Sequence, residues 1–279
     1  MSRRQPAARG RHRRPGKAGS AGPHDEAGPH SRNDHESLAL PRWVAHRGAG
    51  KLAPENTLAA FKLGAAHGYR MFECDAKLSA DGVPFLMHDA RLDRTTSGRG
   101  IGGEQPWSAL AQLDAGSWHS RSHAGEPLPT LENIARFCLA NGYLLNIEIK
   151  PTPGVERETG EAVAREAARL WRGAAVPPLL TSFQVASLEG AHAVQPDLPR
   201  GLLLDNLWDG WLEAAKRLGC VAIVCNHALW DAATVALAHD AGMRALSYTV
   251  NDDWAAQRLI DLGTDGIITD RVDLFSPAG

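Results

Sequence analysis

From Trp43 onward the chain alternates short apolar runs with longer segments whose apolar residues recur every three to four positions. Short runs bounded by Gly, Pro or Asn are typical of buried strands, and the longer period is that of an amphipathic helix. The expected strands are 43–48, 71–79, 83–89, 143–150, 177–183, 200–206, 220–226, 244–250 and 265–270. The expected helices are 56–67 (with Asn56 as N-cap), 130–141, 159–172, 185–195, 208–218, 231–241 and 252–262.

This alternation predicts βα units around a parallel sheet. Nine expected strands are one more than a closed (β/α)8 barrel holds. We assign the surplus to 83–89, because Asp81-Gly82 predicts a two-residue hairpin turn and hence an antiparallel partner for 71–79. No Gly-rich dinucleotide motif follows the first strand, which favours a barrel over an open doubly wound sheet. The expected fold is therefore an α/β barrel at 41–279 with an irregular segment at about 90–129.

Length and composition agree with one such barrel plus a tail. The chain has 279 residues, is 43% hydrophobic, and contains no apolar stretch long enough to cross a membrane. Residues 1–40 hold eight Lys or Arg against four Asp or Glu and lack apolar periodicity, which predicts a disordered basic tail. The remainder carries an acidic excess, which argues against nucleic-acid binding.

The expected location is the cytoplasm. No apolar segment follows Arg3-Arg4, so the tail does not match an export signal. The four cysteines show neither metal-binding spacing nor a disulfide framework, which is typical of a reducing compartment.

Candidate chemistry begins with carboxylates inside apolar strands. Side chains alternate along a strand, so Glu73 and Asp75 share one face, and Asn146, Glu148 and Lys150 share one face of a later strand. Three buried carboxylates without a cation would be costly, and oxygen ligands select a hard metal such as Mg²⁺ or Ca²⁺. The alternative interpretation is that each carboxylate pairs with an Arg or Lys at a strand end.

Two histidines stand at strand ends beside this set. His46 ends the first strand, and His88 ends the hairpin arm, where a two-residue turn would place it opposite Asp75. Two imidazoles suit a phosphodiester, because one can remove a proton from the nucleophile while the other protonates the leaving alkoxide. Arg47 and Lys150 are the candidate cations for phosphate oxygens, although ion pairs with the carboxylates are equally compatible with their positions.

Nine short segments, in the following order, lie between residues 43 and 271. They are HRGAGKLAPENTLAAF at 46–61, ECDAKLSADG at 73–82, HDARLDRTTSGRG at 88–100, LDAGSW at 113–118, PLPTLE at 127–132, NIEIKP at 146–151, TSF at 181–183, YTVN at 248–251 and DGIITDR at 265–271. Together they resemble the glycerophosphodiester phosphodiesterase family, and most of all its short cytoplasmic bacterial branch.

The resemblance implies a TIM-type (β/α)8 barrel whose mouth is capped by the insertion at about 90–129. It implies metal-dependent hydrolysis of glycerophosphodiesters to sn-glycerol 3-phosphate and an alcohol, with one divalent cation, Mg²⁺ or Ca²⁺. Carried over residue by residue, it implies an acid/base pair, His46 and His88, three metal ligands, Glu73, Asp75 and Glu148, and two phosphate contacts, Arg47 and Lys150.

Two positions depart from the family pattern. Cys74 stands where a larger apolar residue is frequent, on the face away from the metal, and Tyr248 replaces a frequent Trp. Trp107, Trp118 and Phe183 are candidate walls for the alcohol group, with packing in the core as the alternative.

Three other functions remain as hypotheses. A lysophospholipase D needs an apolar rim, whereas 90–129 is polar. A non-catalytic phosphate-binding barrel would be expected to lack a histidine or a ligand, and a sugar-phosphate isomerase or aldolase would carry a late Gly-rich phosphate loop. The partner is expected to be a small-molecule diester, with the alcohol group, the oligomeric state and the choice of acid and base left open.

Overall fold

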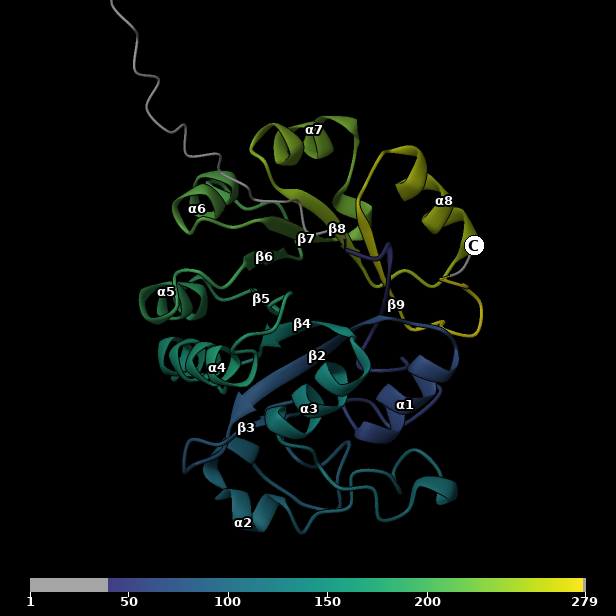
Figure 1. Cartoon of the computed structure of the whole chain (residues 1–279), viewed down its shortest axis with the longest axis vertical. Coiled ribbons are helices and arrows are strands. Elements are labelled where there is room, and N and C mark those ends of the chain that lie inside the picture. The colour runs from purple at the N-terminus through teal and green to yellow at the C-terminus, as the bar shows by residue number, and fades with distance from the viewer. Residues whose placement is uncertain (1–39, 278–279) are drawn as a thin grey trace, which may run out of the picture. The chain divides into compact units, whose positions relative to one another are not determined.

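The computed structural model describes residues 40–277, so the predicted basic tail lies outside the described residues except for Leu40. Eight parallel strands form a closed ring in the order β1-β9-β8-β7-β6-β5-β4-β2, which a β2–β1 pairing completes (Figure 1). Their bounds are β1 Trp43–Ala45, β2 Met71–Leu78, β4 Leu144–Ile149, β5 Leu179–Ser182, β6 Arg200–Leu204, β7 Ala222–Asn226, β8 Arg244–Tyr248 and β9 Gly266–Thr269. The predicted TIM-type barrel is thus confirmed.

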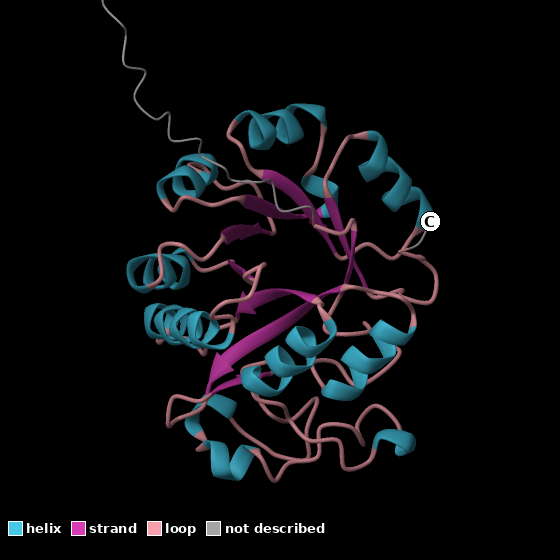
Figure 2. Cartoon of the chain, viewed as in Figure 1, coloured by secondary structure: helices cyan, strands magenta, loops and turns pink. Residues whose placement is uncertain are grey.

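Helices surround the ring of strands (Figure 2). They are α1 Leu58–Ala66, α3 Leu131–Asn141, α4 Glu156–Leu170, α5 Val185–Val194, α6 Trp211–Arg217, α7 Ala232–Asp240 and α8 Asp253–Asp261. The prediction of Asn56 as N-cap is wrong. Thr57 caps α1 by accepting a hydrogen bond from the backbone of Ala60, while Asn56 takes a left-handed φ of 58°. No helix in residues 40–277 is long and apolar enough to span a bilayer.

The hairpin between β2 and β3 (Pro84–Leu86) differs from its prediction by one residue. The loop contains three residues, 80–82, and Gly82 supplies its left-handed conformation with φ 81°. The extra loop residue shifts the register, so the backbone amide of Met87 donates to the carbonyl of Asp75 at 3.1 Å. Met87 therefore lies opposite Asp75, and His88 extends past the last strand pair.

The segment between β3 and α3 forms a small unit beside the barrel, near α1 and α3 (Figure 1). It contains α2 Trp107–Leu110 and the short turns η1 Gly102–Glu104 and η2 Arg121–His123. A hydrophobic cluster of its own holds it together: Phe85, Met87, Leu92, Leu110, Ala115 and Leu128. Trp107 packs on Phe85 in this cluster, with ring centroids 6.0 Å apart, so it serves the core of the insertion.

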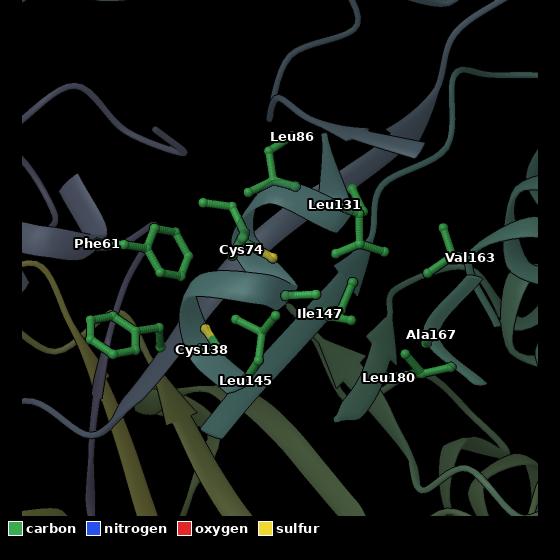
Figure 3. Packing of buried hydrophobic residues seen from close by; sticks show 14 of the residues in the cluster. Phe61, Cys74, Leu86, Leu131, Cys138, Leu145, Ile147, Val163, Ala167 and Leu180 are labelled. Atoms are coloured by element: carbon green, nitrogen blue, oxygen red, sulfur yellow. The ribbon is translucent and has the colours of Figure 1, made fainter. Parts of the chain in front are cut away.

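Two hydrophobic layers support the mouth of the barrel. Side chains such as Met71, Leu203 and Ile268 fill the interior below the strand ends. Between strands and helices lies the larger cluster of Figure 3, to which Cys74 of β2 and Leu131 of α3 both belong. Cys74 thus faces away from the barrel interior, as the alternation along β2 predicts. All four cysteines are buried and unpaired.

Candidate active site

Three carboxylates converge where the middle of β2 pairs with the C-terminal half of β4. Asp75 pairs with Glu148 across the two strands, and Glu73 stands two residues earlier on the same face. One oxygen of each of the three lies within 4.8 Å of the others. Each also has a buried oxygen without a hydrogen-bond partner among the described residues: Glu73 Oε1, Asp75 Oδ1 and Glu148 Oε1. The predicted ligand set is therefore brought together.

Crowding and burial set the charges of this cluster. Burial, followed by repulsion from Asp75, raises the pKa of Glu73 well above its usual range and that of Glu148 to about 8. Burial opposes ionisation of Asp75, but the Arg47 guanidinium and His88 outweigh it and lower the pKa of Asp75 to about 2. The neighbouring cations therefore do not offset burial and mutual repulsion at Glu73 and Glu148. The all-oxygen donors and orphaned oxygens of the cluster fit a hard divalent cation.

Asn56 holds Asp75 in place from the loop after β1. Its side-chain amide donates to Asp75 Oδ2 at 2.9 Å, and its side-chain oxygen accepts from the Asp75 backbone at 3.1 Å. The left-handed backbone at Asn56 turns this amide inward. Asparagine tolerates that conformation better than most residues do, which is a signal the sequence analysis missed.

Each histidine has a carboxylate partner of its own. His46 Nδ1 lies 2.6 Å from Asp270 Oδ1, and His88 Nδ1 lies 2.9 Å from Asp89 Oδ1. An ionised carboxylate only accepts hydrogen bonds, so Nδ1 carries the proton in both rings and Nε2 is left for proton exchange. The Nε2 atom of His46 lies 3.8 Å from Glu73 Oε2.

The electrostatics around the histidines follow from burial and neighbouring charges. Burial lowers the pKa of His88, and the nearby Arg47 adds to this effect, while Asp75 opposes it. Burial opposes ionisation of Asp270, but the hydrogen bond and charge of His46, together with Asn251 and Arg47, outweigh it and lower the pKa of Asp270. Neither Asp89 nor Asp270 was predicted as a site residue.

The two predicted cations also reach the cluster. The backbone amide of Arg47 donates to Glu73 Oε2 at 3.0 Å, and its guanidinium Nε lies 3.4 Å from Asp75 Oδ2. Lys150 Nζ lies 3.7 Å from Glu148 Oε1 and 5.6 Å from the centre of the Phe183 ring. The cations thus approach the carboxylates, as the ion-pair interpretation expects, and also line the cavity.

The cavity has a volume of about 670 Å³ and opens at the C-terminal ends of the strands. The predicted site residues that line it are His46, Arg47, Glu73, His88, Glu148 and Lys150. Further lining residues include Thr181, Phe183, Leu203, Asp205, Trp208 and Tyr248. Of the predicted aromatic walls, Phe183 lies in this cavity, while Trp118 lines a neighbouring one of about 330 Å³.

Comparison of the chain with known proteins identifies its family. Residues 46–274 match the Glycerophosphoryl diester phosphodiesterase family. The chain belongs to this family, whose members are phosphoric diester hydrolases.

Relatives match over most of their own length. The glycerophosphodiester phosphodiesterase of Caldanaerobacter subterraneus is 32% identical over 232 residues, which cover 81% of this chain and 93% of that protein. A Bacillus subtilis glycerophosphodiester phosphodiesterase is 30% identical over 247 residues, covering 83% and 84%. An Oleispira antarctica phosphodiesterase, solved with the product sn-glycerol-3-phosphate, has a TM-score of 0.79 and 34% identity, covering 86% of this chain and 97% of that one.

Proposed function

We propose that this protein hydrolyses glycerophosphodiesters to sn-glycerol 3-phosphate and an alcohol, with one divalent cation, Mg²⁺ or Ca²⁺. One observation carries the proposal. Three carboxylates with unpartnered oxygens, of which Glu73 and Asp75 are buried and Glu148 is half-buried, stand beside two imidazoles, each held at Nδ1 by a carboxylate. The product bound by the Oleispira antarctica relative supports the choice of substrate.

Glu73, Asp75 and Glu148 would hold the cation. When bound, the cation supplies positive charge that polarises the phosphate and acidifies the attacking hydroxyl. It also relieves the repulsion that raises the pKa of Glu73 and Glu148.

The other site residues bind the phosphate and move protons. Arg47 and Lys150 line the cavity beside the cluster and neutralise charge on the phosphate oxygens. One imidazole Nε2 takes the proton of the nucleophile, which is water or the glycerol 2-hydroxyl. The other imidazole enters the step as an imidazolium, protonated on both nitrogens, and gives its Nε2 proton to the leaving alkoxide. Asp270 and Asp89 accept from Nδ1 and so orient each Nε2 for this exchange.

The test is a panel of glycerophospho-choline, -ethanolamine, -glycerol and -inositol with coupled detection of glycerol 3-phosphate. His46→Ala and His88→Ala should each lower kcat by about 10²–10⁴-fold while the unfolding temperature is retained. The matched control is His239→Ala, because His239 also pairs with a carboxylate, Asp265 at 2.7 Å, but is not among the residues that line the cavity.

Two results would contradict the proposal. The first is no glycerol 3-phosphate from any member of the panel with Mg²⁺ or Ca²⁺ present. The second is a histidine variant as active as the His239→Ala control. Turnover of a lysophospholipid in place of the panel would favour the lysophospholipase D alternative.

A further inference from the structure

Arg94, in the insertion after β3, makes more charged contacts at the site than its exposed position suggests. Its Nε and Nη2 donate to the two oxygens of Asp89 at 2.8 and 3.0 Å. Its Nη1 and Nη2 donate to the two oxygens of Glu55 at 2.7 and 3.1 Å. One guanidinium therefore binds two carboxylates bidentately, which is the strongest geometry available to an Arg–carboxylate pair.

Each of these carboxylates holds a different site residue. Asp89 Oδ1 also accepts from His88 Nδ1 at 2.9 Å, and Glu55 Oε2 also accepts from Arg47 Nη1 at 2.7 Å. A continuous chain of hydrogen bonds thus runs from the imidazole proposed for proton transfer to the guanidinium proposed for phosphate binding. Arg94 is its middle member, and negative and positive charges alternate along it.

The surroundings fix Arg94 from the insertion side. Its guanidinium carbon lies 5.9 Å from the ring centre of Trp118, and the indole Nε1 of Trp118 donates to the Ala115 carbonyl at 2.9 Å. The hydrogen bonds from Arg94 also hold the pKa of Asp89 below its usual value. Asp89 is therefore kept as the acceptor that orients His88.

His46 belongs to a separate branch. Its partner Asp270 accepts from Asn251 Nδ2 at 3.1 Å, with no hydrogen bond to Arg94, Asp89 or Glu55 among the described residues. The two histidines are thus positioned independently, one by the barrel and one by the insertion.

We propose that Arg94 is a positioning residue that sets the relative placement of His88 and Arg47. Through Arg94, the residue that transfers a proton (His88) and the residue that contacts the phosphate (Arg47) are held at a fixed position relative to each other. This inference rests on the proposed function. It assigns the insertion a part in the chemistry, because Asp89 and Arg94 both come from it.

The first measurement compares Arg94→Gln with wild type on the best substrate of the panel. We expect kcat/KM to fall by about 10- to 100-fold, the range for outer hydrogen-bond partners that orient site residues. Arg94→Lys should recover only part of the loss, because an ammonium cannot grip two carboxylates bidentately. Arg91→Gln is the matched control: Arg91 lies in the same segment, and its Nε forms an ion pair with Asp93 Oδ2 at 3.3 Å, outside the chain of hydrogen bonds that contains Arg94. It should stay near wild type.

Double variants separate positioning from a general structural effect. Arg94→Gln and Asp89→Asn act on one branch, so the double variant should lose little more than the worse single variant. Arg94→Gln combined with Asp270→Asn acts on both branches, and the two fold-losses should multiply. Unfolding temperatures of all variants verify that each chain is folded.

Chemical rescue gives an independent measurement. The Arg94 side chain is 46% exposed, so a small guanidinium ion can reach the space left in Arg94→Ala. Methylguanidinium below denaturing concentrations should raise kcat/KM of this variant severalfold, whereas urea at the same concentration should not.

The outcomes distinguish the two proposals. An inactive wild type would refute the proposed function. An active wild type with Arg94→Gln within twofold of it, or with Asp89→Asn and Arg94→Gln multiplying their losses, would refute the positioning role alone.

Discussion

Replacing Glu148 by Gln should make the metal-free protein more stable. Glu148 lies between Asp75, its partner across β2 and β4, and Lys150, and burial together with Asp75 raises its pKa to about 8. A neutral amide of the same shape removes a carboxylate that the fold can ionise only at a cost. The same substitution removes one proposed ligand of the cation, so its effect should reverse when metal is added.

The magnitude follows from the pKa. A carboxyl whose pKa rises from 4.5 to about 8 on folding costs at most roughly 5 kcal/mol when both states are ionised. The side chain is 12% exposed, and Gln also loses the 3.7 Å attraction to Lys150, so the net gain in stability should be about 2 kcal/mol. For a domain of this size, that gain raises the unfolding temperature by about 4–8 °C.

The raised pKa of Glu148 determines how the stability difference between Glu148→Gln and wild type changes with pH. Below pH 4.5 the carboxyl is protonated in both states and costs nothing, so Glu148→Gln and wild type should match. As pH rises towards about 8 the folded state holds a proton that the unfolded state has lost, and wild type becomes progressively less stable than the variant. Above that value the difference is constant.

Thermal unfolding in chelator between about pH 5 and pH 9 measures this difference, because this range spans most of the interval between the unfolded and folded pKa values of Glu148. Glu213→Gln, an exposed carboxylate on α6, is the control and should change stability by less than about 0.5 kcal/mol. Saturating Mg²⁺ or Ca²⁺ should then stabilise wild type by about 2.7 kcal/mol at a hundredfold excess over Kd, and the variant by less. A variant no more stable than wild type at high pH in chelator would refute the reasoning.

Three further outcomes are expected. Asp270→Asn should lower kcat by about 10²–10⁴-fold, because the His46 tautomer is no longer fixed, whereas the exposed Asp273→Asn should not. Gly50→Ala should lower the unfolding temperature and the activity, because its Cβ would lie 2.2 Å from the Asp270 carbonyl oxygen; Gly82→Ala, also at positive φ but with no atom within 4 Å, is the control. Chelator should abolish activity and added Mg²⁺ or Ca²⁺ restore it, and full activity in chelator would remove the cation from the reaction.

The alternation of side chains along strands made much of the site predictable. It placed Glu73, Asp75 and Glu148 on one interior face because a strand side chain points the same way every second residue. The prediction from side-chain alternation failed where the length of a loop sets the register between two strands. The third loop residue before Val83 shifted the hairpin register, and His88 reaches the site from beyond the last pair.

Contacts between distant loops were not predictable from the pattern. Arg94 and Glu55 are 39 residues apart, and their pairing depends on how the insertion folds on its own hydrophobic cluster. Asp89 and Arg94 lie in the segment 88–100 that carries the family resemblance, but charged residues in a polar loop resemble solvated surface, so their pairing gave no signal of its own. For Trp107 the sequence left two interpretations open, and its packing on Phe85 inside the insertion favours the core alternative.

The bond between His46 and Asp270 joins residues 224 positions apart. His46 follows the first strand of the ring and Asp270 follows the last, and the two strands are neighbours. During synthesis on the ribosome, the carboxylates of β2 and β4 emerge long before β9 does. The histidine beside them therefore has no partner until the final strand docks and closes the barrel. Catalytic competence should thus appear late and all at once, which makes turnover a reporter of ring closure in refolding or translation experiments.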